Sequence, residues 1–340
     1  MPTPPPPQRL VLCYPVEEKH VQQIEKALDS LGIEAEVVDA GQERVADELL
    51  DADLYCGHAK VPVPWDEIVR RGRLRWIQSS AAGMDHCLVP EVIDSEIMVS
   101  SASGVLADQV ADHTFALLLG VLRSLPTFFE AKAKREFIRR PTRDLHGARV
   151  GIVGFGGNGR RLYEVLKPFR TKVWATDYFP ENAPEGLQAL LPADALEEML
   201  PQVDLLILAA PLNEQTRGMI DAKRLALLPE SAVLVNMARG PLVVEEALAD
   251  ALESGRLAGA GIDVTEVEPL DPSSRLWELP NLIITPHVGG QASRRLDDMT
   301  DFLCENLRRY FRGELPRNYL AEKRLGFPHP SHAAWAESTQ

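Results

Sequence analysis

The segment Val150–Gly159, with the sequence VGIVGFGGNG, constrains the fold of this chain more than any other. An apolar run of strand length passes directly into a G-x-G-x-x-G turn, and a helical stretch is expected from 160 to 167. Gly154 suits the tight turn, Gly156 lets the backbone approach a pyrophosphate, and Gly159 allows helix and strand to pack closely. A helix start also offers free N–H groups and a positive dipole end to phosphates. The pattern therefore predicts a dinucleotide-binding βαβ unit, with Gly157 and Asn158 in the same cofactor loop.

A second apolar run, 172–176, ends at Asp177, about 20 residues after the glycines, where a carboxylate accepts from a ribose 2′-hydroxyl. The same carboxylate would repel a 2′-phosphate. The next residues, Tyr178, Phe179 and Pro180, include no arginine or lysine that could receive one. The sequence therefore favours NAD over NADP.

Length and charge exclude several classes of protein. The 340 residues suffice for two domains, and the net charge of −14 argues against binding to the phosphates of nucleic acid. The four cysteines have neither metal-type spacing nor a disulfide framework, so we expect no metal and a reducing, cytoplasmic location. The sequence contains no run of 18 apolar residues that would indicate a membrane helix, so we expect no membrane partner.

Short apolar runs alternate with helical segments along most of the chain, which is typical of parallel sheets covered on both faces. We expect an α/β protein with two doubly wound parallel-sheet domains. A Rossmann NAD-binding domain (108–291) would be inserted in a smaller, flavodoxin-like substrate domain (1–107 and 292–340), because a long helical stretch, 105–134, leads into the middle of the chain and a last helix, 292–312, leads out of it. The residues after Arg317 look poorly ordered, apart from what Tyr319 and Leu320 can bury. Two crossings would form a hinge, with the active site in a cleft between the domains. The expected strands are 10–14, 34–38, 53–56, 76–79 and 98–100, then 150–154, 173–177, 205–209, 232–236, 259–264 and 282–285.

Three later segments place polar residues after apolar strands, at the edge of a parallel sheet where ligands bind. Arg239 follows the run 233–236, and a guanidinium there can hold a carboxylate through two hydrogen bonds. Glu268 lies in an acidic loop after 259–264, and His287 follows 282–285. Taken singly, each is equally a surface arginine, a solvated loop or a structural histidine. Together, a histidine held by a buried glutamate, a cation for a carboxylate and a dinucleotide meet the needs of hydride transfer to a carbonyl.

These motifs resemble the D-isomer-specific 2-hydroxyacid dehydrogenases, a family that includes glyoxylate/hydroxypyruvate reductases and phosphoglycerate dehydrogenase-like enzymes. The resemblance extends from about 76 to 318 and is most specific in four places: 154–177, Asn236–Gly240, Gly261–Val264 with Glu268-Pro269, and Thr285-Pro286-His287. Asn158 departs from the apolar residue usual after the second glycine, and the acidic loop lacks the aromatic often found after the Asp-Val pair.

The resemblance implies roles for individual residues. His287 would be the acid/base, Glu268 its carboxylate partner and Arg239 the substrate-orienting cation, while Asp263 would contact the nicotinamide carboxamide. Further cofactor contacts would come from Pro211, Thr216, Met237, Ala238, Gly289 and Gly290. The substrate would be bound by the loop Ala81, Ala82 and Gly83, and by His58 and Lys60.

The substrate itself stays open at this point. A small 2-oxo acid such as hydroxypyruvate or glyoxylate is favoured, because phosphoglycerate-type enzymes often carry an arginine where this chain has His58 with Lys60 nearby. The alternatives are a D-3-phosphoglycerate-type or phosphite dehydrogenase, and an NAD-sensing, corepressor-like binding protein. The resemblance also implies a homodimer, for which the apolar segment Leu106–Phe137 is suited.

Overall fold

The computed structural model describes residues 5–336, which divide into two compact units. Unit 1 consists of the residues up to Leu106 together with those from Ala292 onward, and unit 2 consists of Ala107–Gln291. The chain therefore leaves unit 1 once and returns to it once. Each unit contains its own parallel sheet, as the fold-class prediction requires.

Unit 1 contains a five-stranded parallel sheet in the order β2-β1-β3-β4-β5, which is the flavodoxin-like order. In such a sheet the chain turns in opposite directions from two adjacent strands, here β1 and β3, and ligands bind beside their carboxyl ends. The strands are β1 (Arg9–Cys13), β2 (Glu36–Asp39), β3 (Leu54–Gly57), β4 (Trp76–Ser79) and β5 (Met98–Ser100), and the helices are α1 (Glu18–Asp29), α2 (Gly41–Glu48), α3 (Trp65–Arg71), α4 (Pro90–Ile93) and α11 (Arg295–Phe311).

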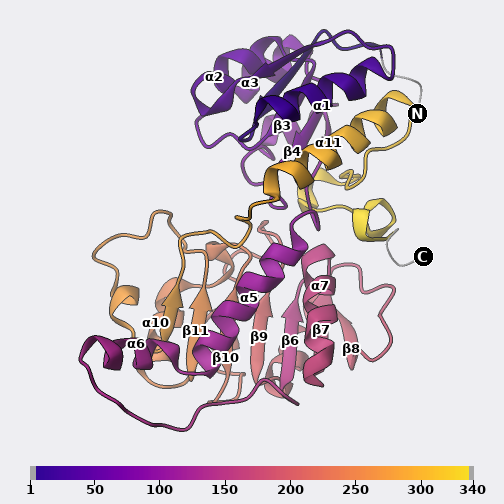
Figure 1. Ribbon diagram of the computed structural model, residues 1–340. Helices are drawn as coiled ribbons and strands as arrows, with labels where there is room; N and C mark the ends of the chain where they lie inside the picture. The colour runs from indigo at the N-terminus through magenta and orange to yellow at the C-terminus, as the bar shows by residue number, and fades with distance from the viewer. Residues whose placement is uncertain (1–4, 337–340) are drawn as a thin grey trace. The chain divides into compact units, whose positions relative to one another are not determined.

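The late helix α11 is integrated into unit 1 and lies beside α1 (Figure 1). A buried polar network joins it to the sheet: Asn306 donates to Gln78 Oε1 over 2.8 Å, and Ser100 Oγ donates to the same atom over 2.7 Å. At the other end of α11, the hydroxyls of Tyr14 and Thr300 are 3.1 Å apart. Because these groups are buried, each depends on its partner in place of water.

Tyr319 and Leu320 are held as expected, but the described residues that follow them form further short helical turns, at Lys323–Leu325, Pro330–His332 and Ala334–Ala336, so the prediction of poor order there was wrong. Tyr319 forms an antiparallel bridge with Ser100, and Leu320 is buried in the core of unit 1. Asn318 is also buried and donates to the carbonyls of Ser101 and Ser103. Short-range sequence patterns miss such a segment because it is held by tertiary contacts rather than by regular secondary structure.

Unit 2 contains a seven-stranded parallel sheet in the order β12-β11-β10-β9-β6-β7-β8. When the strands are renumbered by chain order within unit 2, the order from β8 to β12 is 3-2-1-4-5-6-7. This is the Rossmann order 3-2-1-4-5-6 with one additional strand, and its switch point lies between β6 and β9. β8 was not predicted; three of its four residues are only partly buried, and Pro192 is exposed. The strands are β6 (Arg149–Val153), β7 (Lys172–Asp177), β8 (Ala189–Pro192), β9 (Leu205–Leu208), β10 (Val233–Asn236), β11 (Gly259–Ile262) and β12 (Leu282–Ile284), and the helices are α5 (Ala107–Leu122), α6 (Leu125–Ala133), α7 (Gly157–Leu166), α8 (Leu196–Met199), α9 (Ala222–Leu225) and α10 (Glu245–Glu253).

Helix α5 lies close against the sheet of unit 2 (Figure 1). A Cβ added to Gly261 of β11 would be 2.9 Å from Leu117 Cβ, and one added to Gly259 would be 2.6 Å from Val121 Cγ1. The glycines of β11 thus leave the space that α5 occupies. The helical stretch breaks at Ser124, which has φ +56°, and Pro126 lies in the first turn of α6.

Within residues 5–336, no single helix has both the length and the apolar composition needed to cross a membrane. Helices α5 and α6 meet those criteria only when taken together, and the chain bends by 68° between them.

Candidate functional site

The glycine turn after β6 lies at the switch point of the sheet in unit 2. Gly154 has φ +92°, and a Cβ there would be 2.6 Å from the backbone nitrogen of Ala210, just beyond β9. A Cβ on Gly159 would be 2.1 Å from the Gly154 carbonyl oxygen, so helix α7 could not approach β6 with any larger residue there. At Gly156, by contrast, no atom lies within 4 Å of an added Cβ. This open space beside a helix N-terminus fits a dinucleotide pyrophosphate.

The remaining predicted cofactor residues of this region lie around the same turn. Helix α7 starts at Gly157, earlier than predicted, so that Gly157 and Asn158 form its first turn. Pro211 and Thr216 belong to the loop that follows β9, and Thr216 Oγ1 donates to the Pro211 carbonyl over 2.7 Å. Thr216 therefore stabilises the loop on the other side of the switch point from the glycines.

Asp177 ends β7 and is held by the backbone around it. Its carboxylate accepts from the N–H of Phe155, over 2.6 Å, and from the N–H of Phe179, over 2.9 Å. Burial raises the pKa of the Asp177 carboxyl, and these two N–H groups act in the opposite direction. The Phe155 bond connects Asp177 to the glycine turn, so the carboxylate is positioned beside the loop predicted to bind phosphates.

Arg160 of α7 also lies within electrostatic range of Asp177, and burial lowers the pKa of its guanidinium. It donates to the carbonyls of Glu181 and Asn182 and lies over the Phe155 ring. The three residues that follow Asp177 include no cation, but the fold brings Arg160 to this region from another element, which was not predicted from the sequence.

Three loops at the carboxyl ends of β10, β11 and β12 meet at one edge of the same sheet. The first carries Met237, Ala238 and Arg239, and buried Asn236 shapes it by accepting from the Ala238 N–H and donating to the Arg239 carbonyl. Arg239 donates to the Ala238 carbonyl over 2.8 Å. A Cβ on Gly240 would be 1.8 Å from the Thr265 carbonyl oxygen, so this loop is in direct contact with the one after β11.

His287 and Glu268 are paired: His287 Nδ1 lies 2.8 Å from Glu268 Oε2. Their side chains are 44% and 40% exposed, so the expectation of a buried glutamate was wrong. Both residues lie on loops beyond the strands, where the body of unit 2 covers only part of each side chain. Since a carboxylate can only accept, Nδ1 of His287 carries a proton and Nε2 faces away from the pair.

Asp263 is buried and organises the loop after β12. Its carboxylate accepts from the N–H groups of Val288 and Gly289, over 2.9 and 2.8 Å. Gly289 is confined in turn, because a Cβ there would be 2.4 Å from Met237 Cε. Gly290 follows in the same loop. The structure therefore brings Arg239, Asp263, Glu268, His287 and the two glycines onto loops that touch one another.

Unit 1 has its own polar loops at the carboxyl edge of its sheet. His58 follows β3, its ring stacked on that of His86 at 4.1 Å, and the Lys60 N–H donates to Gln42 Oε1 over 2.7 Å. After β4, Ser79 Oγ accepts from the Ala81 N–H over 3.0 Å. Ala82 and Gly83 continue this loop, and Ala82 is exposed. The predicted substrate residues thus lie at the edge where parallel sheets bind ligands.

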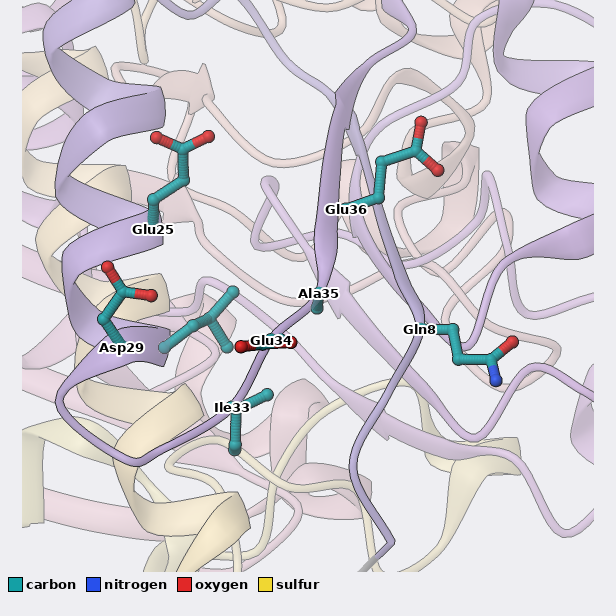
Figure 2. Close-up of a pocket in the computed structure, with 8 residues that line it drawn as sticks. Gln8, Glu25, Asp29, Ile33, Glu34, Ala35 and Glu36 are labelled. Carbon is teal, nitrogen blue, oxygen red and sulfur yellow. The ribbon is translucent and has the colours of Figure 1, made fainter.

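A cavity of about 560 Å³ lies at the opposite edge of this sheet, where β2 begins (Figure 2). Its lining includes the carboxylates of Glu25, Asp29, Glu34 and Glu36, of which Glu36 is paired with Arg9 at 3.2 Å. The acidic lining and the position at the amino ends of the strands both disfavour an anionic substrate.

Three polar residues of this site were not predicted to have a role: Asn236, which shapes the Arg239 loop, and Thr285 and His113. Thr285 Oγ1 lies 2.6 Å from Asp263 Oδ1 and 2.9 Å from His113 Nε2. Asn236 and Thr285 belong to the motifs quoted above. The partners of the Asn236 amide are only two and three residues away, so an amide before a loop is the signal that could have identified it. The side-chain partners of Thr285 are far away in sequence and could not be predicted from it.

A Rossmann sheet with a G-x-G-x-x-G turn and a paired histidine is typical of a dinucleotide-dependent α/β protein, and comparisons identify its family. The family profile described as D-isomer specific 2-hydroxyacid dehydrogenase, NAD binding domain, matches residues 115–289. A glyoxylate reductase of Pyrococcus furiosus is 32% identical over 81% of this chain and 84% of its own length. A D-3-phosphoglycerate dehydrogenase of Methanocaldococcus jannaschii is 28% identical over 91% of this chain and 59% of its own length.

Among solved structures, a D-isomer specific 2-hydroxyacid dehydrogenase from Xanthobacter autotrophicus Py2, in complex with NADPH and MES, is 28% identical. It aligns with a TM-score of 0.75 over 94% of this chain and 99% of its own. The chain belongs to the D-isomer specific 2-hydroxyacid dehydrogenase family. It is an NAD(P)-dependent oxidoreductase that interconverts 2-oxo and 2-hydroxy acids.

Proposed function

We propose that this enzyme reduces a small 2-oxo acid to the 2-hydroxy acid with NADH, using His287 as the acid: glyoxylate would give glycolate, and hydroxypyruvate would give the D-hydroxy acid. The observation that carries the proposal is the pairing of His287 with Glu268, 2.8 Å apart, on loops in contact with the one that bears Arg239. The glyoxylate reductase of Pyrococcus furiosus, similar over most of both chains, supports the choice of substrate.

The roles of the side chains follow from their donors. When bound, the nicotinamide ring supplies or accepts the hydride at C2 of the substrate. His287 keeps its Nδ1–H on Glu268, so the protonated ring presents Nε2–H to the substrate oxygen. Arg239 is anchored through the Ala238 carbonyl, and its guanidinium orients the carboxylate beside the reacting carbonyl. In the oxidation direction, His287 Nε2 accepts the hydroxyl proton.

In this proposal, different residues contact different parts of the dinucleotide. Gly154, Gly156, Gly157, Asn158 and Gly159 hold the pyrophosphate, and Asp177 accepts from the adenosine ribose. Pro211, Thr216, Met237, Ala238, Asp263, Gly289 and Gly290 line the nicotinamide half. The carboxylate at Asp177 supports a preference for NADH, since it would repel a 2′-phosphate. Arg160 is committed to two carbonyls, which reduces its use for that phosphate.

The loop Ala81, Ala82 and Gly83 is proposed to hold the substrate carboxylate through backbone N–H groups. His58 and Lys60 would meet the distal end of the substrate. A hydroxymethyl or hydrogen there suits a histidine beside one flexible cation, whereas a phosphate is better matched by an arginine fork.

The deciding experiment follows NADH oxidation with glyoxylate, hydroxypyruvate, pyruvate, 2-oxoglutarate and 3-phosphohydroxypyruvate, with NADPH in parallel. We expect turnover of glyoxylate or hydroxypyruvate, faster with NADH, and its loss in His287→Gln. His146→Gln is the matched control, because His146 is an exposed histidine of the same unit outside the site. Equal activity of the two variants would refute the role given to His287.

A phosphorylated substrate is the second candidate, supported by Lys60 and by similarity to a D-3-phosphoglycerate dehydrogenase. If 3-phosphohydroxypyruvate is preferred, Lys60→Ala should raise its KM and leave that of glyoxylate unchanged. Turnover of phosphite alone would favour the phosphite dehydrogenase alternative. NADH binding without any turnover would favour a corepressor-like binding protein.

We further propose that the enzyme is a cytoplasmic homodimer formed through unit 2. Helix α6 and the segment after it expose large apolar side chains, with Phe129 63% and Phe137 92% exposed. Leu117, Leu118 and Leu122 of the predicted interface are instead buried within unit 2, so only the later part of Leu106–Phe137 is suited to a partner. Light scattering after size exclusion should give twice the chain mass, and Phe137→Ser should weaken the dimer. A monomer mass for the unaltered protein would refute this interface.

A further inference from the structure

His287 adopts a backbone conformation that residues with a side chain rarely take. Its φ is +54°, in the left-handed region, where the Cβ crowds the backbone. Such a conformation persists only when the surroundings determine it. The direction in which the His287 ring leaves the loop depends on this conformation, so whatever holds the backbone also aims the imidazole at Glu268.

Asp263 holds this backbone through three consecutive peptide groups. Its carbonyl oxygen accepts from the His287 N–H over 2.7 Å, and its carboxylate accepts from the N–H groups of Val288 and Gly289. Asp263 is only 3% exposed, so water contributes little to fixing the carboxylate. The orientation of this side chain therefore depends on its other protein partners.

The other contacts assign the protons between Asp263 and His113. Thr285 Oγ1 lies 2.6 Å from Asp263 Oδ1, and because a carboxylate only accepts, the hydroxyl donates its single proton to it. Thr285 Oγ1 also lies 2.9 Å from His113 Nε2, and because its only proton is already donated to Asp263, it can only accept a hydrogen bond from His113. His113 therefore carries a proton on Nε2 and donates it to Thr285.

Helix α5 places His113 at this position. Leu117, one turn later on the same face, lies against Gly261 of β11. That strand leads into Asp263, and β12 leads into Thr285, so the ends of two neighbouring strands and one face of α5 converge. The closest partners of the His113 ring are Thr285 Oγ1 and, at 3.4 Å, Asp263 Oδ1.

We propose that His113 is a positioning residue of the reaction. Its Nε2–H orients the Thr285 hydroxyl, which orients the Asp263 carboxylate, which holds residues 287–289 in the conformation that presents His287 to Glu268. The proposal rests on the function proposed for His287 as the acid/base. His113 itself does not touch the substrate.

The first test compares variants that break the chain of hydrogen bonds with variants that keep its atoms. Thr285→Val removes the hydroxyl at nearly constant shape, and His113→Leu removes the donor. We expect either change to lower kcat on the order of 10²-fold, the effect of a small misplacement of a catalytic group. Thr285→Ser and His113→Gln retain a hydroxyl and an Nε2–H donor, and should recover most of kcat.

Thermal unfolding of all four variants separates positioning from general damage, since each variant should remain folded at the temperature of the kinetic assay. Equal losses of kcat in Thr285→Val and Thr285→Ser, or an unchanged kcat in His113→Leu, would overturn the proposal.

The second test does not depend on activity. In protein labelled with ¹⁵N-histidine, the ring signals lost in His113→Gln belong to His113, and their shifts report which nitrogen is protonated. The Nε2–H form is expected, and an Nδ1–H form would overturn the proposal. If His287→Gln keeps full activity, the proposed function fails, and the His113 tautomer still decides the inference about the hydrogen bonds.

Discussion

Substitution of Gly156 by alanine separates cofactor binding from folding. Gly156 has φ −73° and ψ −156°, which an alanine can adopt, and its added methyl would meet no atom within 4 Å. Loss of glycine freedom in the unfolded chain stabilises by about 0.4–1 kcal/mol. Loss of glycine from a helix N-cap costs roughly 0.5 kcal/mol or slightly more. The two effects oppose, so the free energy of unfolding should stay within about 1 kcal/mol of its original value.

The same methyl occupies the space through which the start of α7 would approach a pyrophosphate. A displaced phosphate loses one or two charge-assisted hydrogen bonds, of which each contributes about 1.5–3 kcal/mol. Loss of even one lowers the affinity for NADH by roughly 10- to 150-fold. This binding loss is much larger than the change expected in stability.

The assay is a fluorescence titration of NADH combined with thermal unfolding, and Gly159→Ala is the contrasting variant. Its Cβ would be 2.1 Å from the Gly154 carbonyl oxygen, so β6 and α7 would have to separate. We expect Gly159→Ala to lose both stability and binding, and Gly156→Ala to lose binding alone. Unchanged NADH affinity in Gly156→Ala would refute the placement of the pyrophosphate, and a large fall in its unfolding temperature would refute the account of the open space.

Three further outcomes can be checked directly. Glu268→Gln should lower kcat on the order of 10²-fold with little change in unfolding temperature, since the pair is exposed; steady-state kinetics would contradict the proposed pairing if kcat were retained. Asp204→Asn should lower the free energy of unfolding by about 1 kcal/mol or less near neutral pH, because hydrogen bonds from the partly exposed Arg149 lower the pKa of Asp204. This stabilisation is present above the pKa of Asp204 in the unfolded chain and is lost as pH falls through its lower pKa in the folded protein. Urea unfolding should therefore show the difference between this variant and the unaltered protein narrowing below about pH 4, and a constant difference would argue against the ion pair. Gln78→Leu should destabilise unit 1 by roughly 2–5 kcal/mol, because Ser100 Oγ and Asn306 Nδ2 lose a buried acceptor; a loss under about 1 kcal/mol in the same assay would count against the network.

Most strands were predictable because they are uniformly apolar and are followed by loops with polar or charged residues. The predicted strand 76–79 matches β4, and 233–236 of β10 lies within the predicted 232–236. The glycine turn was predictable in its individual roles, since the close approach of Gly159 to Gly154 and the open space at Gly156 follow from the motif alone.

What the sequence could not predict depends on contacts between distant segments. The ordered tail after Arg317 is fixed by its bridge to Ser100, and β8 pairs with β7 although it is only half-buried. The exposure of Glu268 was misjudged because loops at the edge of a sheet receive little cover from the strands that carry them. Arg160 was not predicted as a neighbour of Asp177, nor His113 as a neighbour of Asp263. Both lie on helices, and only tertiary packing decides which loop a helix face meets.

The depth at which α5 lies against β11 limits how this enzyme can vary. Gly259 and Gly261 touch Val121 and Leu117, and any larger side chain at either position would lift the helix from the sheet or shift it along its axis. One helical residue rises about 1.5 Å, so a shift of that size already exceeds the tolerance of the hydrogen bond between His113 and Thr285. If His113 positions the reacting groups as proposed, Gly259 and Gly261 carry a constraint imposed by catalysis although they pack against a helix. A search for variants with altered turnover has reason to include these core positions along with the loops.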